Sequence, residues 1–454
     1  MKYISNIFVV LSVLVLTNSC KKFLEEIPDK KLAIPSTLGD LQSILDNFAT
    51  MNNQSPVVLE IMSDNQFVRN DQMFNAVTDE TTKDLYKWQR NESNNWSNLY
   101  DVIFTANTIL DNLPGISYNP ATEQGTWNSI KGSALFFRAY NFYFCSQIFG
   151  QPFDKNTSGQ DLGIVLRLNS DFNEVSMRST VKQSYDQIIS DFREAISLLP
   201  EKTALKTRPT RAAAFGALSR TYLAMQEYDS AGKYADLCIQ HYGGVDSLLN
   251  FNNNAEVNVT ATIPFPLPMV NKEIIFHYKG GTIAILSNAR TRSDSNLYKS
   301  YAPNDRRKAA YYKTDSSFKG DYGASGTQGY TYGGIVLDEM FLIRAESYAR
   351  KGDKTNALID LNALMAKRCT TFVNITAVDA NDALNKILVE RRKELIFRGT
   401  RWVDLRRLMK EPQFAVTPRR FVNGQFYELL PNSPRYTVLI PAQVIALSGI
   451  QQNQ

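Results

Sequence analysis

The chain has 454 residues, of which 43% are hydrophobic and 11% aromatic, enough to bury a large core in one elaborate domain or two. Its 50 basic and 45 acidic residues nearly balance, for a net charge of +5. No stripe of Lys and Arg with interleaved aromatic residues runs along the chain, which argues against a nucleic-acid-binding protein.

The N-terminal segment has the pattern of a lipoprotein signal peptide. One positive residue precedes an apolar run, Ile4 to Leu16, which is shorter than the roughly 20 apolar residues of a spanning helix. We expect residues 1–19 to be cleaved and Cys20 to be acylated, with residues 20–35 as a tether. An ordinary cleaved signal and an uncleaved anchor helix stay open, because Thr17 stands where lipoproteins commonly have Leu.

The next part of the chain is mostly helical in pattern. Ser36-Thr37 and the apolar residues that follow at a period near 3.6 predict a capped helix. Residues 62–82 are polar without a clear period and predict a long loop. A strong helix is predicted from Trp96 to Leu113, and an aromatic-rich one over residues 127–149, buried on several faces.

Two segments have the spacing of tetratricopeptide helix pairs, one over residues 218–238 and one over residues 341–364. In both copies a small residue, Ser219 or Ala345, would let two helices approach closely. An amphipathic helix from Thr180 to Leu199 precedes the first copy. Because the two copies lie far apart, we expect helix pairs that alternate with long insertions.

The segment between the two copies, residues 243–335, has a different composition. It is rich in Gly, Pro and Tyr, with short β-like runs such as Glu273–Tyr278. A long loop-rich insertion in a helical scaffold usually carries function. Helical pattern returns over residues 379–411, and the tail contains a strand-like stretch, Tyr436–Ile440.

Three cysteines remain besides Cys20, namely Cys145, Cys238 and Cys369, without a CxxC motif. We expect all three to be small buried residues; one disulfide with a free thiol is the alternative.

Enzyme motifs are missing from the sequence. It has two His residues, and no HExxH, GxSxG, P-loop, dinucleotide or EF-hand motif. We therefore expect no catalysis and no cofactor. A pair of carboxylates for glycoside hydrolysis, which need only be close in space, and a structural Ca²⁺ in a carboxylate-rich loop both stay open.

Residues 387–408, ILVERRKELIFRGTRWVDLRRL, resemble the C-terminal signature of the SusD/RagB-like outer-membrane nutrient-binding lipoproteins. Other segments resemble the family in the same order, and together they cover nearly the whole mature chain: Trp96–Asn107, Arg138–Gly150, Val181–Pro200, Ala213–Ile239, Leu337–Arg368 and Tyr436–Asn453. One departure is the C-terminus, which ends in Gln-Gln-Asn-Gln where the family often ends in Gln-Asn-Pro-Gly-Tyr.

The resemblance implies a mostly α fold, a superhelix of tetratricopeptide-like helix pairs with a loop-rich, partly β second half. It implies one domain over residues 36–454, lipid-anchored at the outer face of the outer membrane. Such proteins bind glycans or other nutrients and deliver them to a TonB-dependent, SusC-like barrel, which they cap as a lid. Family members are binders and not hydrolases.

The residues of the 387–408 signature indicate a structural role rather than a binding or catalytic one. Their dense mixture of Arg, Lys, Glu and Asp indicates internal ion pairs, because Arg pairs with carboxylates through two hydrogen bonds. Trp402 is interpreted as a packing residue rather than a sugar platform.

A sugar-binding site requires an aromatic ring that stacks on the C–H face of the sugar and planar polar groups that bond its hydroxyls. Residues 63–98 and 290–332 fit, and by family position these stretches flank the ligand face. Trp88 is the preferred stacking residue, since Trp96 begins a strong helix. The candidate binding residues are Asp64, Asn65, Arg69, Asn70, Trp88, Arg90, Arg292, Tyr322, Tyr330 and Tyr332.

Two other functions remain open from the sequence. One is a tetratricopeptide-type adaptor lipoprotein that binds protein segments, and the other is a lipid-anchored glycoside hydrolase. The sequence does not name the ligand.

Overall fold

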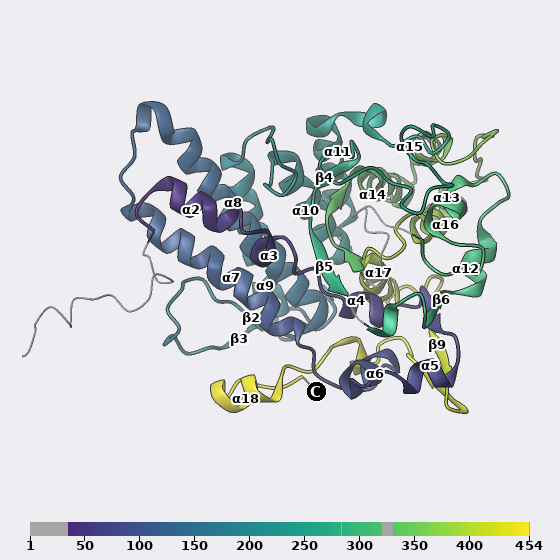
Figure 1. Ribbon diagram of the computed structural model, residues 1–454, viewed down its shortest axis with the longest axis horizontal. Helices are drawn as coiled ribbons and strands as arrows, with labels where there is room; N and C mark the ends of the chain where they lie inside the picture. Colours follow the sequence, from purple (N-terminus) through teal and green to yellow (C-terminus); the bar gives the residue numbers. More distant parts are fainter. Residues whose placement is uncertain (1–34, 283, 320–329, 454) are drawn as a thin grey trace, which may run out of the picture.

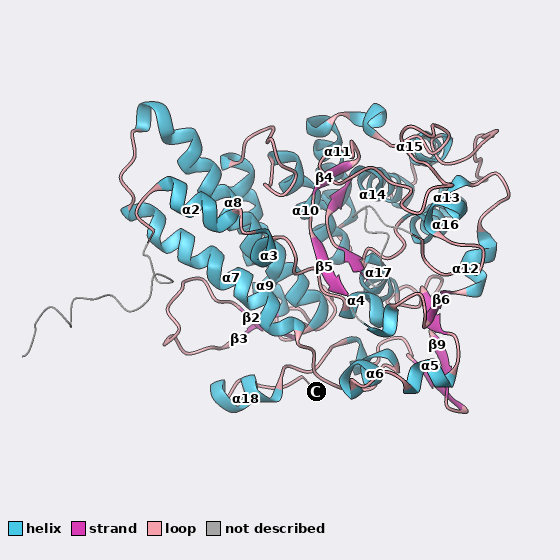
Figure 2. Ribbon diagram, in the orientation of Figure 1, coloured by secondary structure: helices cyan, strands magenta, loops and turns pink. Residues whose placement is uncertain are grey.

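The computed structural model describes residues 35–282, 284–319 and 330–453, without the side chain of Tyr330. Helices dominate these residues, and the strands are short (Figures 1 and 2). The predicted signal peptide, Cys20, the predicted tether up to residue 34, and Tyr322 lie outside the described residues.

The scaffold is a series of helices in which sequence neighbours mostly pack side by side. Its long helices are α2 (Leu38–Leu45), α7 (Asn95–Asn112), α8 (Pro120–Ile148), α9 (Val181–Leu198), α10 (Arg211–Ala224), α11 (Tyr228–Tyr242), α14 (Leu337–Arg350), α15 (Lys354–Ala366), α16 (Ala380–Glu394) and α17 (Thr400–Leu408). Helix α11 packs directly on α14, so the two predicted helix pairs, α10–α11 and α14–α15, are neighbours in space. The mostly α fold is therefore confirmed.

Short elements fill the segments between the long helices. The short helices are α3 (Phe48–Met51), α4 (Val58–Ile61), α5 (Asp71–Asn75), α6 (Glu80–Tyr86), α12 (Ser295–Ser300), α13 (Arg306–Tyr311) and α18 (Ala442–Ser448). Five antiparallel strand pairs are described: β1 (Gln66–Val68) with β6 (Thr291–Ser293), β2 (Leu162–Val165) with β3 (Arg178–Thr180), β4 (Ile274–Phe276) with β8 (Ile335–Val336), β5 (Lys279–Thr282) with β7 (Tyr330–Tyr332), and β9 (Arg419–Val422) with β10 (Gln425–Glu428).

Small residues allow the close helix contacts that the repeat pattern predicts. The Ser219 hydroxyl donates a 2.8 Å hydrogen bond to the carbonyl of Ala231, which ties α10 to α11. A Cβ atom at Gly232 would lie 2.2 Å from the hydroxyl oxygen of Ser347. No side chain therefore fits at position 232 unless α11 and α14 move apart.

Most helix boundaries agree with the prediction, and Thr37 caps α2 with its side chain as expected. Helix α8 begins at Pro120, earlier than predicted. The predicted loop over residues 62–82 is wrong in part, because it contains β1, α5 and the start of α6. The predicted strand Tyr436–Ile440 is reduced to one bridge, from Leu439 to Glu92.

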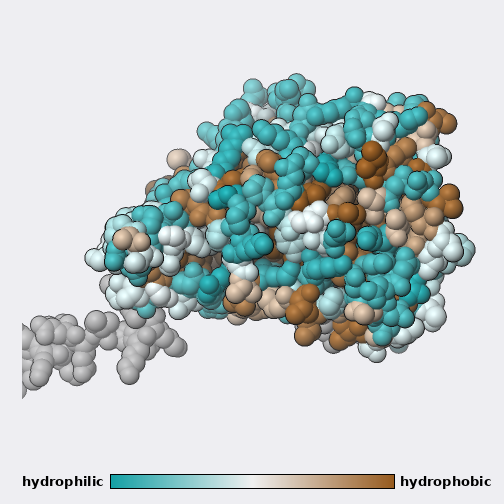
Figure 3. Space-filling model, turned by 90° about the horizontal axis from the view of Figure 1, so that it is seen from above, coloured by the Kyte–Doolittle hydropathy of each residue, from teal (hydrophilic) through white to brown (hydrophobic). Residues whose placement is uncertain are grey.

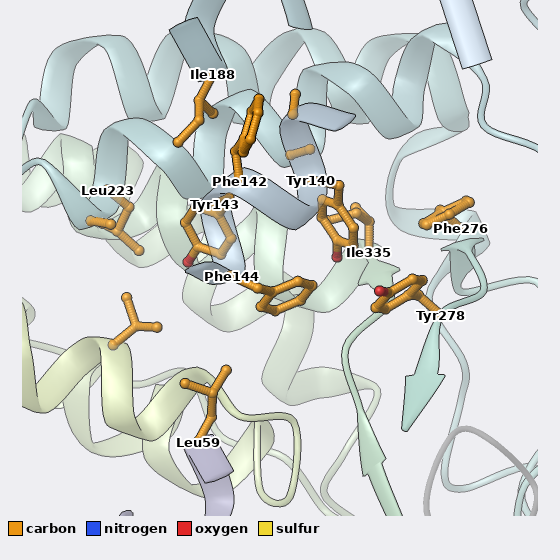
Figure 4. Packing of buried hydrophobic residues seen from close by; sticks show 14 of the residues in the cluster. Leu59, Tyr140, Phe142, Tyr143, Phe144, Ile188, Leu223, Phe276, Tyr278 and Ile335 are labelled. Atoms are coloured by element: carbon orange, nitrogen blue, oxygen red, sulfur yellow. The ribbon is translucent and has the colours of Figure 1, made fainter. Parts of the chain in front are cut away.

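Aromatic residues join the helical scaffold to the loop-rich insertion. Tyr140 and Phe144 of α8 pack against Phe276 and Tyr278 at β4 (Figure 4). The Tyr278 hydroxyl donates a 2.9 Å hydrogen bond to the side chain of Asn141. This interface, buried throughout, fixes the insertion against the helices.

The cysteine prediction is confirmed, since Cys145, Cys238 and Cys369 are buried and unpaired. Burial raises the pKa of the Cys369 thiol to about 11, which makes it a poor nucleophile.

The charged residues of the 387–408 signature form buried ion pairs, as predicted. Arg391 bonds Asp404 at 2.9 Å, and Arg407 bonds both Asp404 and Glu346. Glu390 and Glu394 both contact the guanidinium of Arg307. Trp402 is also a packing residue as expected: its ring is buried and stacks on Tyr436 at 5.2 Å. These pairs hold α16 and α17 against the rest of the molecule.

Candidate functional site

The pairing of β1 with β6 brings together the two stretches predicted to bind ligand. Phe67 stands opposite Arg292 in the register. The amide of Arg69 donates to the carbonyl of Arg290 at 2.9 Å, and the amide of Asp294 donates to the carbonyl of Asn65 at 2.7 Å. The two stretches, far apart in sequence, therefore form one ridge at the side of the molecule (Figure 1).

Asp64 lies at the end of this ridge, in contact with two arginines of the signature. Its carboxylate accepts hydrogen bonds from Arg401 at 2.6 and 2.8 Å, and Arg392 lies 3.3 Å away. Burial favours the neutral acid, but the charges of Arg401 and Arg392 prevail and hold the pKa of Asp64 well below its usual range. The site thus contains a permanently charged cluster.

A pocket of about 400 Å³ opens beside this cluster, between α12, α16, α17 and the loop after α17. We call it the apolar pocket. Its apolar lining residues are Leu297, Leu388, Val389, Leu408, Phe414 and Val416. Its polar lining residues are Asn296, Ser300, Asn385, Arg392, Arg401, Asp404 and Gln413. Apolar walls with a few fixed polar groups are typical of small-molecule sites of this size.

The structure contradicts the prediction that Trp88 is a sugar platform. The side chain has no exposed surface. Its indole N–H donates a 2.8 Å hydrogen bond to the carbonyl of Met62, and the guanidinium of Arg420 lies 4.2 Å from the ring centre. A buried ring offers no face to a sugar, so Trp88 is a structural residue.

Two further candidates are buried and make internal contacts. The Asn65 side chain donates to the carboxylate of Glu60 at 3.2 Å, and Tyr332 is 1% exposed. Burial raises the pKa of Glu60 to about 7, although Asn65 and Ser63 donate to it. Asn65 therefore supports the ridge from within, and neither Asn65 nor Tyr332 presents an exposed side chain to a ligand.

The remaining described candidates lie at the surface. Arg69 and Asn70 are exposed, and Asn70 caps α5 by accepting a 2.9 Å hydrogen bond from the amide of Met73. Arg90 is exposed and donates to the carbonyl of Asn453. Arg292 is half-buried and pairs with Asp315 at 2.9 Å. Arg69 and Arg292 lie on the ridge, whereas Arg90 contacts the C-terminal segment.

Sequence reasoning missed two groups of exposed apolar side chains. Val389 is 53% exposed and directly precedes the charged run that begins at Glu390, and this apolar residue at the edge of the run was the available signal. Phe421 and Phe426 face each other across β9 and β10, 4.8 Å apart and both largely exposed. The Asn423-Gly424 turn between them is a typical hairpin signal.

The hydrophobic side chains at the surface are dispersed among polar ones on the face drawn in Figure 3. In the described residues, no helix is both long and apolar enough to cross a membrane. The same ranges contain no group of three or more His, Cys, Asp or Glu arranged to hold a metal ion.

Known proteins resemble this chain in sequence and in fold. A family model described as starch-binding and associating with the outer membrane matches residues 22–223, and the SusD family model matches residues 250–428. SusD-like protein P2 of Formosa agariphila is 23% identical over 371 residues, which are 69% of this chain and 71% of the relative.

Solved structures also share the fold. A putative sugar binding protein of Bacteroides vulgatus superposes with a TM-score of 0.72 at 22% identity, covering 93% of this chain and 99% of its own. A SusD superfamily protein of Bacteroides thetaiotaomicron gives the same TM-score and identity, covering 92% and 100%. With two family models that together match most of its length, the chain belongs to the SusD/RagB family of proteins.

Proposed function

We propose that this protein binds glycans at the cell surface and that the apolar pocket is part of its binding site. The observation that carries the proposal is the pocket of about 400 Å³ where α12, from the second candidate stretch, meets the signature helices. Asp64, from the first stretch, pairs with Arg392 and Arg401 of its lining. The SusD-family match and the sugar-binding description of a structural relative support the choice of ligand class.

The pocket contains the two kinds of group that a sugar requires. Phe414 supplies an aromatic face for the C–H groups of a pyranose ring. Asn296, Asn385 and Gln413 supply amides that can donate to one hydroxyl and accept from the next. Arg401 is fixed by Asp64, so its orientation is set before a ligand arrives, which lowers the entropic cost of binding.

Replacing Phe414 by Ala is expected to weaken binding of the cognate oligosaccharide by about tenfold or more, the range of an aromatic hot spot. A glycan array identifies that oligosaccharide, and isothermal titration calorimetry measures its affinity. The matched control is Phe104→Ala, since Phe104 is 51% exposed on α7 and lines no part of the pocket. Equal affinities for both variants and the unchanged protein would remove Phe414 from the site.

We further propose that Cys20 carries a lipid anchor and that the protein delivers its ligand to a TonB-dependent, SusC-like barrel. The signal-like N-terminus and the family support this assignment. In intact cells, radiolabelled palmitate is expected to label the protein and to be absent from a Cys20→Ser variant. Unchanged labelling would contradict the anchor, and failure of the unchanged protein to co-purify with a barrel would contradict the delivery role.

The protein is proposed to bind without cleaving its ligand, as the absence of enzyme motifs in its sequence suggests. Release of reducing ends from a panel of polysaccharides by the purified protein would contradict this and favour a hydrolase.

A further inference from the structure

A second pocket, of about 440 Å³, lies on the other side of α12 and has a different chemistry. We call it the lysine pocket. Lys308 of α13, Lys313 and Lys319 line it, together with the rings of Tyr298 and Tyr312. Helix α12 contributes Asn296 and Leu297 to the apolar pocket and Tyr298 to the lysine pocket, so the two pockets are neighbours.

The backbone holds the three lysines around this pocket. Tyr312 and Phe318 form a β-bridge, and the amide of Lys313 donates to the carbonyl of Ser317 at 2.9 Å. This tight turn places Lys313 and Lys319 on its two arms. The Lys319 ammonium donates to the carbonyls of Val259 and Ala309, which fixes its position and leaves one N–H without an acceptor among the described residues.

The positive charge of the pocket is not neutralised by its own acids. Within the described ranges, no carboxylate oxygen lies within 4.0 Å of any of the three ammonium groups. Asp305 also lines the pocket, but its carboxylate accepts 2.9 and 2.6 Å hydrogen bonds from Arg307.

The other nearby acid, Asp315, is also engaged. Its carboxylate pairs with Arg292 at 2.9 Å and accepts a hydrogen bond from the Ser317 hydroxyl at 2.6 Å. Burial and the neighbouring charge of Lys313 both lower the pKa of Lys319, as expected when cations converge without an anion.

An aromatic ring lies among these charges. The Lys308 ammonium is 4.4 Å from the centre of the Tyr298 ring, and Tyr298 packs edge-on against Tyr312 at 5.4 Å. A ring for the C–H face of a sugar, with ammonium groups around it, is the combination that recognises a sugar bearing a negative group.

We propose that the lysine pocket binds an anionic group, a carboxylate or a sulfate, of the glycan captured by this protein. The inference rests on the proposed function and specifies its ligand class as an acidic glycan. Charge-assisted hydrogen bonds from Lys308 and Lys313 would hold the anion, while Lys319 adds a fixed positive charge behind it.

The anion site is tested first by titrating inorganic sulfate into the purified protein. Binding is measured by NMR from the Cε resonances of ¹³C-labelled lysine. Sulfate is expected to shift the Lys308, Lys313 and Lys319 signals to saturation. The Lys308→Gln/Lys313→Gln variant should bind at least tenfold more weakly. The control Lys299→Gln/Lys202→Gln removes the same net charge at two exposed lysines outside the pocket and should bind normally. No saturation, or equal weakening in both variants, would overturn the inference.

Matched oligosaccharides then test the ligand class. Tetragalacturonate is compared with its uncharged methyl ester, and a sulfated tetrasaccharide with its desulfated form, which distinguishes carboxylate from sulfate. At least one charged member should bind tenfold more tightly than its neutral form, and the Lys308→Gln/Lys313→Gln variant should lose that preference. Equal affinity of every charged and neutral pair would overturn the acidic-glycan inference and leave glycan binding intact. Saturation by sulfate without binding of any oligosaccharide would contradict the proposed function instead.

Discussion

Replacing Arg307 by Met is expected to lower the free energy of unfolding by about 3–5 kcal/mol, the usual cost of removing one partner from a buried ion pair. The Arg307 side chain has no exposed surface and contacts three carboxylates, those of Asp305, Glu390 and Glu394. Arg368 still pairs with Glu394 and Lys393 with Glu390, but Asp305 loses the guanidinium that holds its carboxylate. Urea denaturation, with the midpoint and slope fitted together, measures the loss.

Arg419→Met is the matched control, because the same substitution there breaks an exposed ion pair with Glu428. That change should cost less than about 1 kcal/mol, as solvent screens the pair and the freed carboxylate stays hydrated. Arg307→Lys keeps the charge but loses the planar fork, and its stability should fall between the two. If Arg307→Met were as stable as Arg419→Met, the buried network would not be a source of stability.

The network shows what sequence patterns can predict about this fold. The 387–408 segment alternates core-type residues with Arg and Glu at helical spacing, and a helix with charges on several faces needs internal partners. The pattern therefore indicated buried pairing for residues such as Arg391 and Glu394. It could not name Arg307 as the partner of Glu394 or Glu339 as a partner of Arg391, because Arg307 and Glu339 lie on other helices and only the tertiary fold brings them close.

The candidate site was harder to predict than the scaffold. Strands β1 and β6 have three residues each and pair across more than 200 positions, so no local pattern reveals their register. On the basis of the family resemblance, residues 63–98 and 290–332 were expected to flank the ligand face, and β1 and β6, which belong to these stretches, pair with each other. Which side chains face outward was not predictable, since a polar loop residue such as Asn65 can serve a buried carboxylate as readily as a ligand.

Trp88 is a second residue whose burial could not be predicted from the sequence. Trp88 lies in a polar segment, which favoured an exposed side chain. The residue that covers it, Arg420, comes from β9 near the other end of the chain, so local sequence could not indicate the burial. Arg420 lies against both Tyr86 and Trp88, at 3.8 and 4.2 Å from their ring centres, and donates to the carbonyl oxygens of Ile61 and Ser63. Burial lowers the pKa of Arg420 to about 10, so the two rings and the carbonyls must stabilise its charge.

Trp88→Ala is therefore expected to cost about 3–5 kcal/mol of stability, through the cavity it leaves and the exposed flank of Arg420. Trp88→Phe keeps most of the volume and should cost less, although the hydrogen bond to Met62 is lost. The affinity of the folded protein for its oligosaccharide, measured below the melting temperature of each variant, should stay unchanged for Trp88→Phe. If Trp88→Ala were as stable as the unchanged protein but no longer bound the oligosaccharide, Trp88 would be a sugar platform after all. Removing an exposed ring costs little stability and can still abolish a contact to the ligand, whereas removing a buried ring destabilises the fold.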